Sequence, residues 1–215
     1  TGSGQATGVS LQASLELACG DINGWLSGID VAAPVKLLVM NTRTDTAYAM
    51  AAMRELHDNG IRFVIGPYSS AELSAIRQFA NDHGMIVISP SSVAVSLAIP
   101  GDNIYRFVSS DLVQGKAMAK YLSEDKVRVV LPIIRDDVWG NDLLNATSLE
   151  FKKAGGLVNT PVWYNPVTSD FTGILLQAEE AVAGLMKQYP ADDIAVYSLN
   201  FSEGISILKA SSGYQ

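Results

Sequence analysis

Three turns rich in hydroxyl and aromatic side chains are the parts of this sequence best suited to recognising a ligand. They span residues 67–70, 89–92 and 136–140, and each follows a short apolar run with the length of a buried strand. In open parallel sheets, ligands bind just outside the carboxyl ends of the strands, where helix N-termini offer free N–H groups to an anion. Ser69 or Ser70 would add a hydroxyl donor there, although serines in such turns also serve as helix caps. The three turns together favour a small polar ligand.

The familiar catalytic and nucleotide-binding motifs do not occur in the sequence. It has no P-loop, no G-x-S-x-G elbow and no H-E-x-x-H helix. Gly2, Gly4 and Gly8 have the spacing G-x-G-x-x-x-G, which departs from the dinucleotide-binding pattern, so we expect a flexible loop before a helix. His57 and His83 lie near predicted helix C-termini, where the helix dipole favours a cationic imidazole.

One pair of acidic residues leaves an enzymatic function as a remote alternative. Asp136 and Asp137 follow a predicted strand and could hold a metal together with Asn141 or Asp142. Carboxylates at the end of a strand are more often caps or solvated loop residues. We therefore predict no catalytic residue, no metal, no cofactor and a protein that is not an enzyme.

The elements that would position these turns alternate between strands and helices. Apolar runs without polar alternation are typical of strands buried on both faces of a parallel sheet. Such runs occur at 35–40, 63–65, 85–88, 127–134 and 194–197. Between them, cap residues and terminal Gly or Pro predict helices over about 46–59, 70–83, 110–123, 140–154 and 171–189. This order predicts an α/β fold with right-handed crossovers.

Composition narrows the class of protein further. The 215 residues carry 15 Lys and Arg against 22 Asp and Glu, a formal charge of −7, and 48% of them are hydrophobic. That much apolar material excludes intrinsic disorder, and an acidic chain without a basic cluster is a poor partner for nucleic acid. No apolar run approaches the ~20 residues of a membrane span, so we predict no direct membrane insertion. Cys19 is the single cysteine and has no internal disulfide partner.

Four blocks in order resemble the type I periplasmic binding proteins, with the branched-chain amino-acid (Leu/Ile/Val) binding proteins of ABC importers as the nearest group. The blocks are Val64-Ile65-Gly66-Pro67-Tyr68-Ser69-Ser70, Ile86-Val87-Ile88-Ser89-Pro90-Ser91-Ser92, Tyr105-Arg106-Phe107 and Trp139-Gly140. Residues 8–23 also resemble the first helix of that family, which ends here in Asp21-Ile22-Asn23.

The resemblance implies two lobes, each a mostly parallel sheet flanked by helices. Residues 1–110 would form lobe one and residues 111–215 part of lobe two. Family members begin with a strand directly before the glycine-rich loop and continue well past the position of Gln215. The chain also starts without Met, a basic n-region or an apolar h-region, so we expect an excerpt truncated at both ends.

The resemblance also implies where a ligand would bind. In the family, an amino acid lies in a cleft between two lobes that close by hinge motion. The loop Tyr68-Ser69-Ser70 would hold the α-carboxylate, with Ser70 donating through its hydroxyl and backbone N–H. In the second serine turn, Ser91-Ser92, the Ser91 carbonyl would accept from the α-ammonium.

Two positions depart from the family pattern, whereas two aromatic residues follow it. Val93 stands where a hydroxyl normally contacts the ammonium, and Thr7 stands where an aromatic ring often covers the side chain. Trp139 and Phe201 fall where lobe two places rings over the ligand, which favours an apolar or flat side chain. A branched-chain or aromatic amino acid is the expected ligand, and small amides and aromatic carboxylates stay open.

The function implied by the resemblance is capture of a small amino-acid-like ligand for an ABC transporter permease. The location would be periplasmic or extracellular, free or lipid-anchored. The alternative is the same fold acting as the extracellular ligand-sensing domain of a receptor. Gene neighbourhood, or a membrane span following the chain, would separate the two. An enzyme using Asp136 and Asp137 stays the remote alternative.

Overall fold

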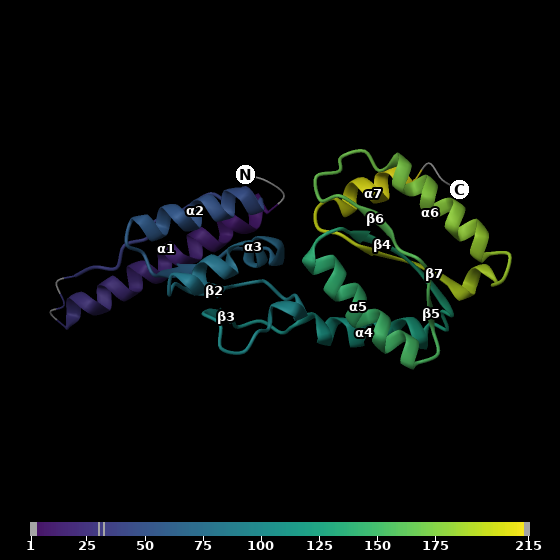
Figure 1. Cartoon of the computed structure of the whole chain (residues 1–215), viewed down its shortest axis with the longest axis horizontal. Helices are drawn as coiled ribbons and strands as arrows, with labels where there is room; N and C mark the ends of the chain where they lie inside the picture. The colour runs from purple at the N-terminus through teal and green to yellow at the C-terminus, as the bar shows by residue number, and fades with distance from the viewer. Residues whose placement is uncertain (1–3, 30, 32, 213–215) are drawn as a thin grey trace.

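Two parallel sheets organise the chain in the computed structural model, which describes residues 4–29, 31 and 33–212 (Figure 1). The first sheet has the strand order β1-β2-β3, and its strands are β1 (Phe63–Ile65), β2 (Ile86–Ser89) and β3 (Ile104–Arg106). The second sheet is built round β4, and its strands are β4 (Val129–Arg135), β5 (Leu157–Val158), β6 (Val162–Tyr164) and β7 (Ile194–Leu199). All strand pairs are parallel.

Helices flank both sheets, as the alternating pattern predicts. The first sheet is accompanied by α1 (Gln5–Gly28), α2 (Thr46–Asp58), α3 (Ser70–Asp82) and the short η1 (Val95–Leu97). The second is accompanied by α4 (Asp111–Glu124), α5 (Val138–Lys153), α6 (Thr172–Leu185), η2 (Ala191–Asp193) and α7 (Gly204–Ser211). We call these groups the first lobe and the second lobe. The predicted two-lobed α/β fold with parallel sheets is confirmed.

Strand β4 shows why a continuous apolar run belongs at the centre of a sheet. Its backbone pairs with β7 along one edge and with β5 and β6 along the other, and each of its seven residues is buried because helices cover both faces of the sheet. Successive side chains of a strand point to opposite faces. Val130 and Ile134 therefore join the core under α4 and α5, whereas Leu131 and Ile133 join the core under α6 and α7.

The prediction of a strand at residues 35–40 is wrong. This segment forms no regular secondary structure and belongs to neither sheet. A strand is stabilised by hydrogen bonds to a neighbour, and among the described residues β1 is the outer strand, paired only with β2. A cavity of about 270 Å³ lies beside β1, lined by Leu11 and Leu15 of α1, by residues 38–40 and by β1 itself.

Smaller differences concern where elements begin and end. The glycine-rich start was expected to be a loop, yet α1 already begins at Gln5, while Gly2 lies outside the described residues. Strands β3, β5 and β6 were not predicted, because each is short and lies outside the continuous apolar runs. His57 lies in the last turn of α2 and His83 caps α3, as expected. In the described part of the chain, no helix combines the length and apolarity of a membrane span.

Candidate functional site

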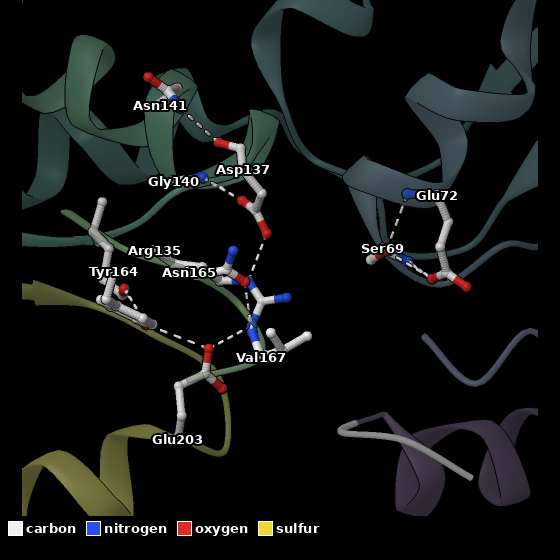
Figure 2. A network of polar contacts seen from close by, with 11 residues as sticks. Ser69, Glu72, Arg135, Asp137, Gly140, Asn141, Tyr164, Asn165, Val167 and Glu203 are labelled. Carbon is white, nitrogen blue, oxygen red and sulfur yellow. Dashed lines mark hydrogen bonds and ion pairs between the residues drawn. The ribbon is translucent and has the colours of Figure 1, made fainter. Parts of the chain in front are cut away.

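The first serine turn forms the N-terminus of α3 in the first lobe. Ser69 is the N-cap residue, and its hydroxyl accepts a hydrogen bond from the Glu72 backbone N–H at 3.2 Å. The Glu72 carboxylate in turn accepts from the Ser69 backbone N–H at 3.1 Å and from its hydroxyl at 2.6 Å (Figure 2). This is a capping box, which fixes the direction in which the first turn of the helix points. The hydroxyl of Ser69 is therefore committed to the helix.

Ser70, the next residue, connects the two serine turns. Its Oγ lies 2.9 Å from Ser92 Oγ and accepts a hydrogen bond from the Ala94 backbone N–H at 3.3 Å. Ser91 donates its hydroxyl to the Tyr68 carbonyl at 2.6 Å. The turns after β1 and β2 are thus cross-linked by hydroxyl groups, and both Ser70 and Ser92 are buried.

The second lobe contributes a pair of aromatic rings in tilted contact. Trp139 lies in the first turn of α5, and Phe201 lies in the loop between β7 and α7. Their ring centroids are 4.5 Å apart with an interplanar angle of 31°, within the distance at which aromatic pairs attract. Both residues are half-buried, so the pair keeps part of its surface accessible.

A buried ionic cluster of Arg135, Asp137, Tyr164 and Glu203 lies beside this ring pair, and the sequence analysis missed it. Arg135, the last residue of β4, donates to Asp137 at 2.5 Å and to Glu203, and its guanidinium carbon lies 4.7 Å from the Phe201 ring centroid. The Tyr164 hydroxyl donates to the Leu199 carbonyl at 2.9 Å and lies 3.3 Å from Glu203 (Figure 2). An arginine at the end of an apolar run, two residues before Asp137, is the local signal that could have indicated this cluster.

The electrostatics of the ionic cluster follow from burial and pairing. Burial works to lower the pKa of Arg135, but hydrogen bonds and charges from Asp137 and Glu203 raise it overall, so the guanidinium stays cationic. Burial also raises the pKa of the Tyr164 hydroxyl, and the nearby Glu203 raises it further, so the phenol stays neutral. Two carboxylates beside one guanidinium leave a formal charge of −1 next to the ring pair.

Asp137, which the sequence suggested as a possible metal ligand, instead caps helix α5 and pairs with Arg135. One of its carboxylate oxygens accepts from the Gly140 backbone N–H at 2.9 Å, which makes it the N-cap of α5, and the other pairs with Arg135. A side chain at Gly140 would collide with the Arg135 carbonyl, so glycine lets the helix begin this close to β4. Asp136 is exposed. Among the residues that the structure describes, no three His, Cys, Asp or Glu side chains are grouped to hold a metal.

The two lobes meet close to these groups. Tyr68 of the first lobe and Phe201 of the second have ring centroids 6.4 Å apart. The Ser96 backbone N–H donates to Asp142 at 2.7 Å, and the Asp111 backbone N–H donates to the Val93 carbonyl at 3.0 Å. The serine turns of the first lobe and the aromatic pair of the second lobe therefore both lie at the junction, on its opposite sides.

The remaining predicted residues differ in how they are placed. Val93 is half-buried, and its carbonyl accepts the Asp111 N–H at the junction. Thr7 is exposed in the first turn of α1, near the Gly4 N-cap, which donates its backbone N–H to Thr44 at 3.0 Å. The space in which a Gly4 side chain would lie is bounded by Tyr68, so the start of α1 reaches the same edge of the first sheet.

Comparison with known proteins identifies the family. A family model described as periplasmic binding protein matches residues 1–198. The chain belongs to this family. The resemblance inferred from the four sequence blocks is thereby confirmed, and curated relatives of this periplasmic binding protein include several Leu/Ile/Val-binding proteins.

Two curated relatives show the extent of the similarity. An uncharacterized protein of Methanocaldococcus jannaschii is 29% identical over 199 residues, covering 90% of this chain and 46% of that protein. The Leu/Ile/Val-binding protein of Escherichia coli K12 is 26% identical over 172 residues, covering 77% of this chain and 45% of that protein. The chain spans less than half the length of these relatives.

Solved structures agree with the fold. A leucine binding protein from Thermotoga maritima superposes with a TM-score of 0.69 at 25% identity, covering 86% of this chain and 51% of that one. An ABC transporter substrate-binding protein from Desulfitobacterium hafniense in complex with Leu superposes with a TM-score of 0.65 at 21% identity, covering 93% and 57%. The periplasmic binding protein described here therefore shares the fold of these two proteins.

Proposed function

We propose that this periplasmic binding protein captures an amino acid with an apolar side chain, branched or aromatic, between its two lobes. One observation carries the proposal: the serine-rich N-terminus of α3 and the Trp139–Phe201 ring pair lie on opposite sides of one junction, bridged by the contact of Tyr68 with Phe201. The names of the Leu/Ile/Val-binding relatives and the leucine complex of the solved neighbour support the same class of ligand.

In this proposal the first lobe binds the polar end of the amino acid. Ser70 Oγ accepts from the Ala94 N–H and lies 2.9 Å from Ser92 Oγ. The proposal assigns Ser92 as the donor of that hydrogen bond, which leaves the Ser70 proton for the ligand carboxylate. The positive end of the α3 dipole favours the same anion. The Ser91 carbonyl accepts from the ammonium, with Ser92 beside it. Val93 supplies no hydroxyl, so the ammonium has one partner fewer than is usual in the family.

The second lobe binds the side chain of the amino acid. Trp139 and Phe201 offer a flat apolar surface, and burying a branched or aromatic side chain against it removes apolar area from water. The proposal places Thr7, which is exposed in the first turn of α1, at the border of the same space from the first lobe. No proton or electron is transferred in this scheme, which is binding alone.

The proposed setting is extracytoplasmic delivery to an ABC transporter permease. The family and the transporter named in the Desulfitobacterium hafniense neighbour support it. The lobes would close on the ligand by hinge motion about the segment between β3 and α4, where residues 107–110 connect the two sheets.

A thermal-shift screen of the full-length protein tests the proposal. The panel holds the twenty common amino acids, small amides and aromatic acids. A ligand at ~100 times its dissociation constant adds about 2.7 kcal/mol to the folded state, which raises the melting temperature by roughly 2–4 °C per kcal/mol. We expect a branched-chain or aromatic amino acid to produce this shift, and Ser70→Ala to abolish it.

The matched control is Ser74→Ala, because Ser74 lies exposed on the same helix, away from the serine turns. It should keep the full shift. A panel in which no amino acid raises the melting temperature would remove amino acids as ligands and contradict the proposal. A ligand-induced rise in melting temperature that persists in Ser70→Ala would show that Ser70 does not bind the ligand carboxylate.

A further inference from the structure

The loops that carry the two aromatic rings are tied together by a single side chain, Arg135. Trp139 follows Asp137 by two residues, and Phe201 precedes Glu203 by two residues. Arg135 pairs with both of these carboxylates (Figure 2). Since Asp137 caps α5 and Glu203 directly precedes α7, the guanidinium connects the starts of the two helices beside which the rings lie.

Arg135 also contacts one ring directly. Its guanidinium carbon lies 4.7 Å from the Phe201 centroid, and Phe201 lies 4.5 Å from Trp139. A planar guanidinium stacks on an aromatic face and forms two parallel hydrogen bonds, whereas a lysine ammonium is a compact point charge without a flat face. The chemistry of arginine therefore matches both contacts, and lysine matches only the charge.

Burial makes this arrangement rigid. The Arg135 side chain is 6% exposed, and those of Asp137 and Glu203 are 7% and 10% exposed. Buried ions are costly to leave unpaired, so each of the three groups restrains the other two. Tyr164 adds a hydrogen bond to the Leu199 carbonyl at the end of β7, which holds the loop before Phe201.

We infer that Arg135 is a positioning residue that sets the Trp139–Phe201 ring pair in place before a ligand arrives. The ligand-binding consequence rests on the proposed function, but the arrangement of the rings does not depend on it. A preorganised ring pair loses little freedom when a side chain packs against it, which favours affinity. Arg135 itself need not touch the ligand.

Tryptophan fluorescence tests the arrangement without any ligand. In a background of Trp25→Phe and Trp163→Phe, which replace two exposed rings, the emission comes from Trp139 alone. Arg135→Lys keeps the charge that the buried carboxylates need but loses the flat stacking group. We expect the Trp139 emission of this variant to move to longer wavelength and to be quenched more strongly by acrylamide. Unchanged emission and quenching would overturn the inference.

Two further variants keep this test decisive. Tyr197→Phe removes the buried hydrogen bond to Thr147 but keeps the ring that belongs to the same core as Trp139, so it should lower stability and leave the Trp139 emission unchanged. If Arg135→Lys does not fold, the combined variant Arg135→Met, Asp137→Asn, Glu203→Gln removes all three charges and should show the same loosened ring pair. A wild-type spectrum from either Arg135 variant contradicts the positioning role.

Calorimetric titration with leucine and phenylalanine then connects the ring pair to binding in the full-length protein. Arg135→Lys should weaken binding about three- to tenfold, the range expected for loss of an ordered aromatic contact. Tyr197→Phe should bind as the wild type does. If the wild type binds neither amino acid, the proposed function fails while the fluorescence result still decides the role of Arg135. Wild-type affinity in Arg135→Lys would contradict the consequence for binding.

Discussion

The two halves of the candidate site are built by different physical means. In the first lobe, neutral hydroxyls and backbone groups are aimed by a capping box, and the partners Ser69 and Glu72 are three residues apart. In the second lobe, two aromatic rings are held by a buried arginine and two carboxylates, and Arg135 and Glu203 are 68 residues apart. The first half therefore takes its geometry from one helix terminus, while the second depends on the packing of a whole sheet.

This difference predicts that charge removal in the second lobe has the largest effect on stability. Arg135→Met leaves two buried carboxylates without a cation, which should lower the free energy of unfolding by about 3–5 kcal/mol. Urea unfolding followed by circular dichroism measures the loss. The combined variant with Asp137→Asn and Glu203→Gln should recover most of it, because no unpaired charge remains. An Arg135→Met protein as stable as the wild type would show that the ionic cluster does not stabilise the second lobe.

The junction between the halves should respond to pH through Asp111. Burial, followed by the charge of Asp142, raises the pKa of this carboxyl from 3.8 to about 6, while Arg106 opposes the rise. One of its oxygens is buried without a partner. A raised carboxyl pKa means that the folded state holds more protons between about pH 4 and pH 6, so its contribution to stability falls as pH rises through that window.

Asp111→Asn should therefore raise the free energy of unfolding by about 1–3 kcal/mol above pH 7, with no gain below pH 4. Melting temperatures of both proteins from pH 3.5 to pH 8 measure this. A gain that is the same at every pH would show that the carboxyl does not titrate in this window.

The capping box of the first lobe should contribute less than the ionic cluster. Ser69→Ala removes one hydroxyl cap and should cost about 1 kcal/mol of unfolding free energy, within the usual range for N-caps. Ser74→Ala on the same helix should be neutral or slightly stabilising, since alanine is the better helix former. Urea unfolding compares the two variants. Equal losses in the free energy of unfolding would show that the Ser69 hydroxyl does not stabilise α3 as its N-cap.

A surface ion pair in the second lobe provides the smallest expected effect. Lys120 and Glu124 lie 3.6 Å apart on α4, with side chains 75% and 67% exposed. Lys120→Ala should change the free energy of unfolding by less than about 0.5 kcal/mol, because exposed pairs are screened by water and salt. A loss comparable with that of Arg135→Met would mean that burial is not what separates the two kinds of ion pair.

The same difference explains what could be predicted from the sequence. A serine cap at the start of α3, the strands β2, β4 and β7, and the serine turns follow from patterns within a few residues, so their positions were predicted closely. The pairing of Arg135 with Glu203 depends on parallel strands that lie far apart in the sequence, and no local pattern specifies it. The segment 35–40 has the composition of a strand, but its state depends on a neighbour, which composition does not reveal.

The central claim is that one ligand is held at its carboxylate by the first lobe and at its side chain by the second. A calorimetric double-mutant cycle of Ser70→Ala and Trp139→Ala, titrated with leucine in the full-length protein, tests it most directly. Each variant should weaken binding by about 1.5–3 kcal/mol, and the effects should add to within about 0.5 kcal/mol, because the two groups contact different ends of the ligand. Wild-type affinity in either single variant would contradict the claim.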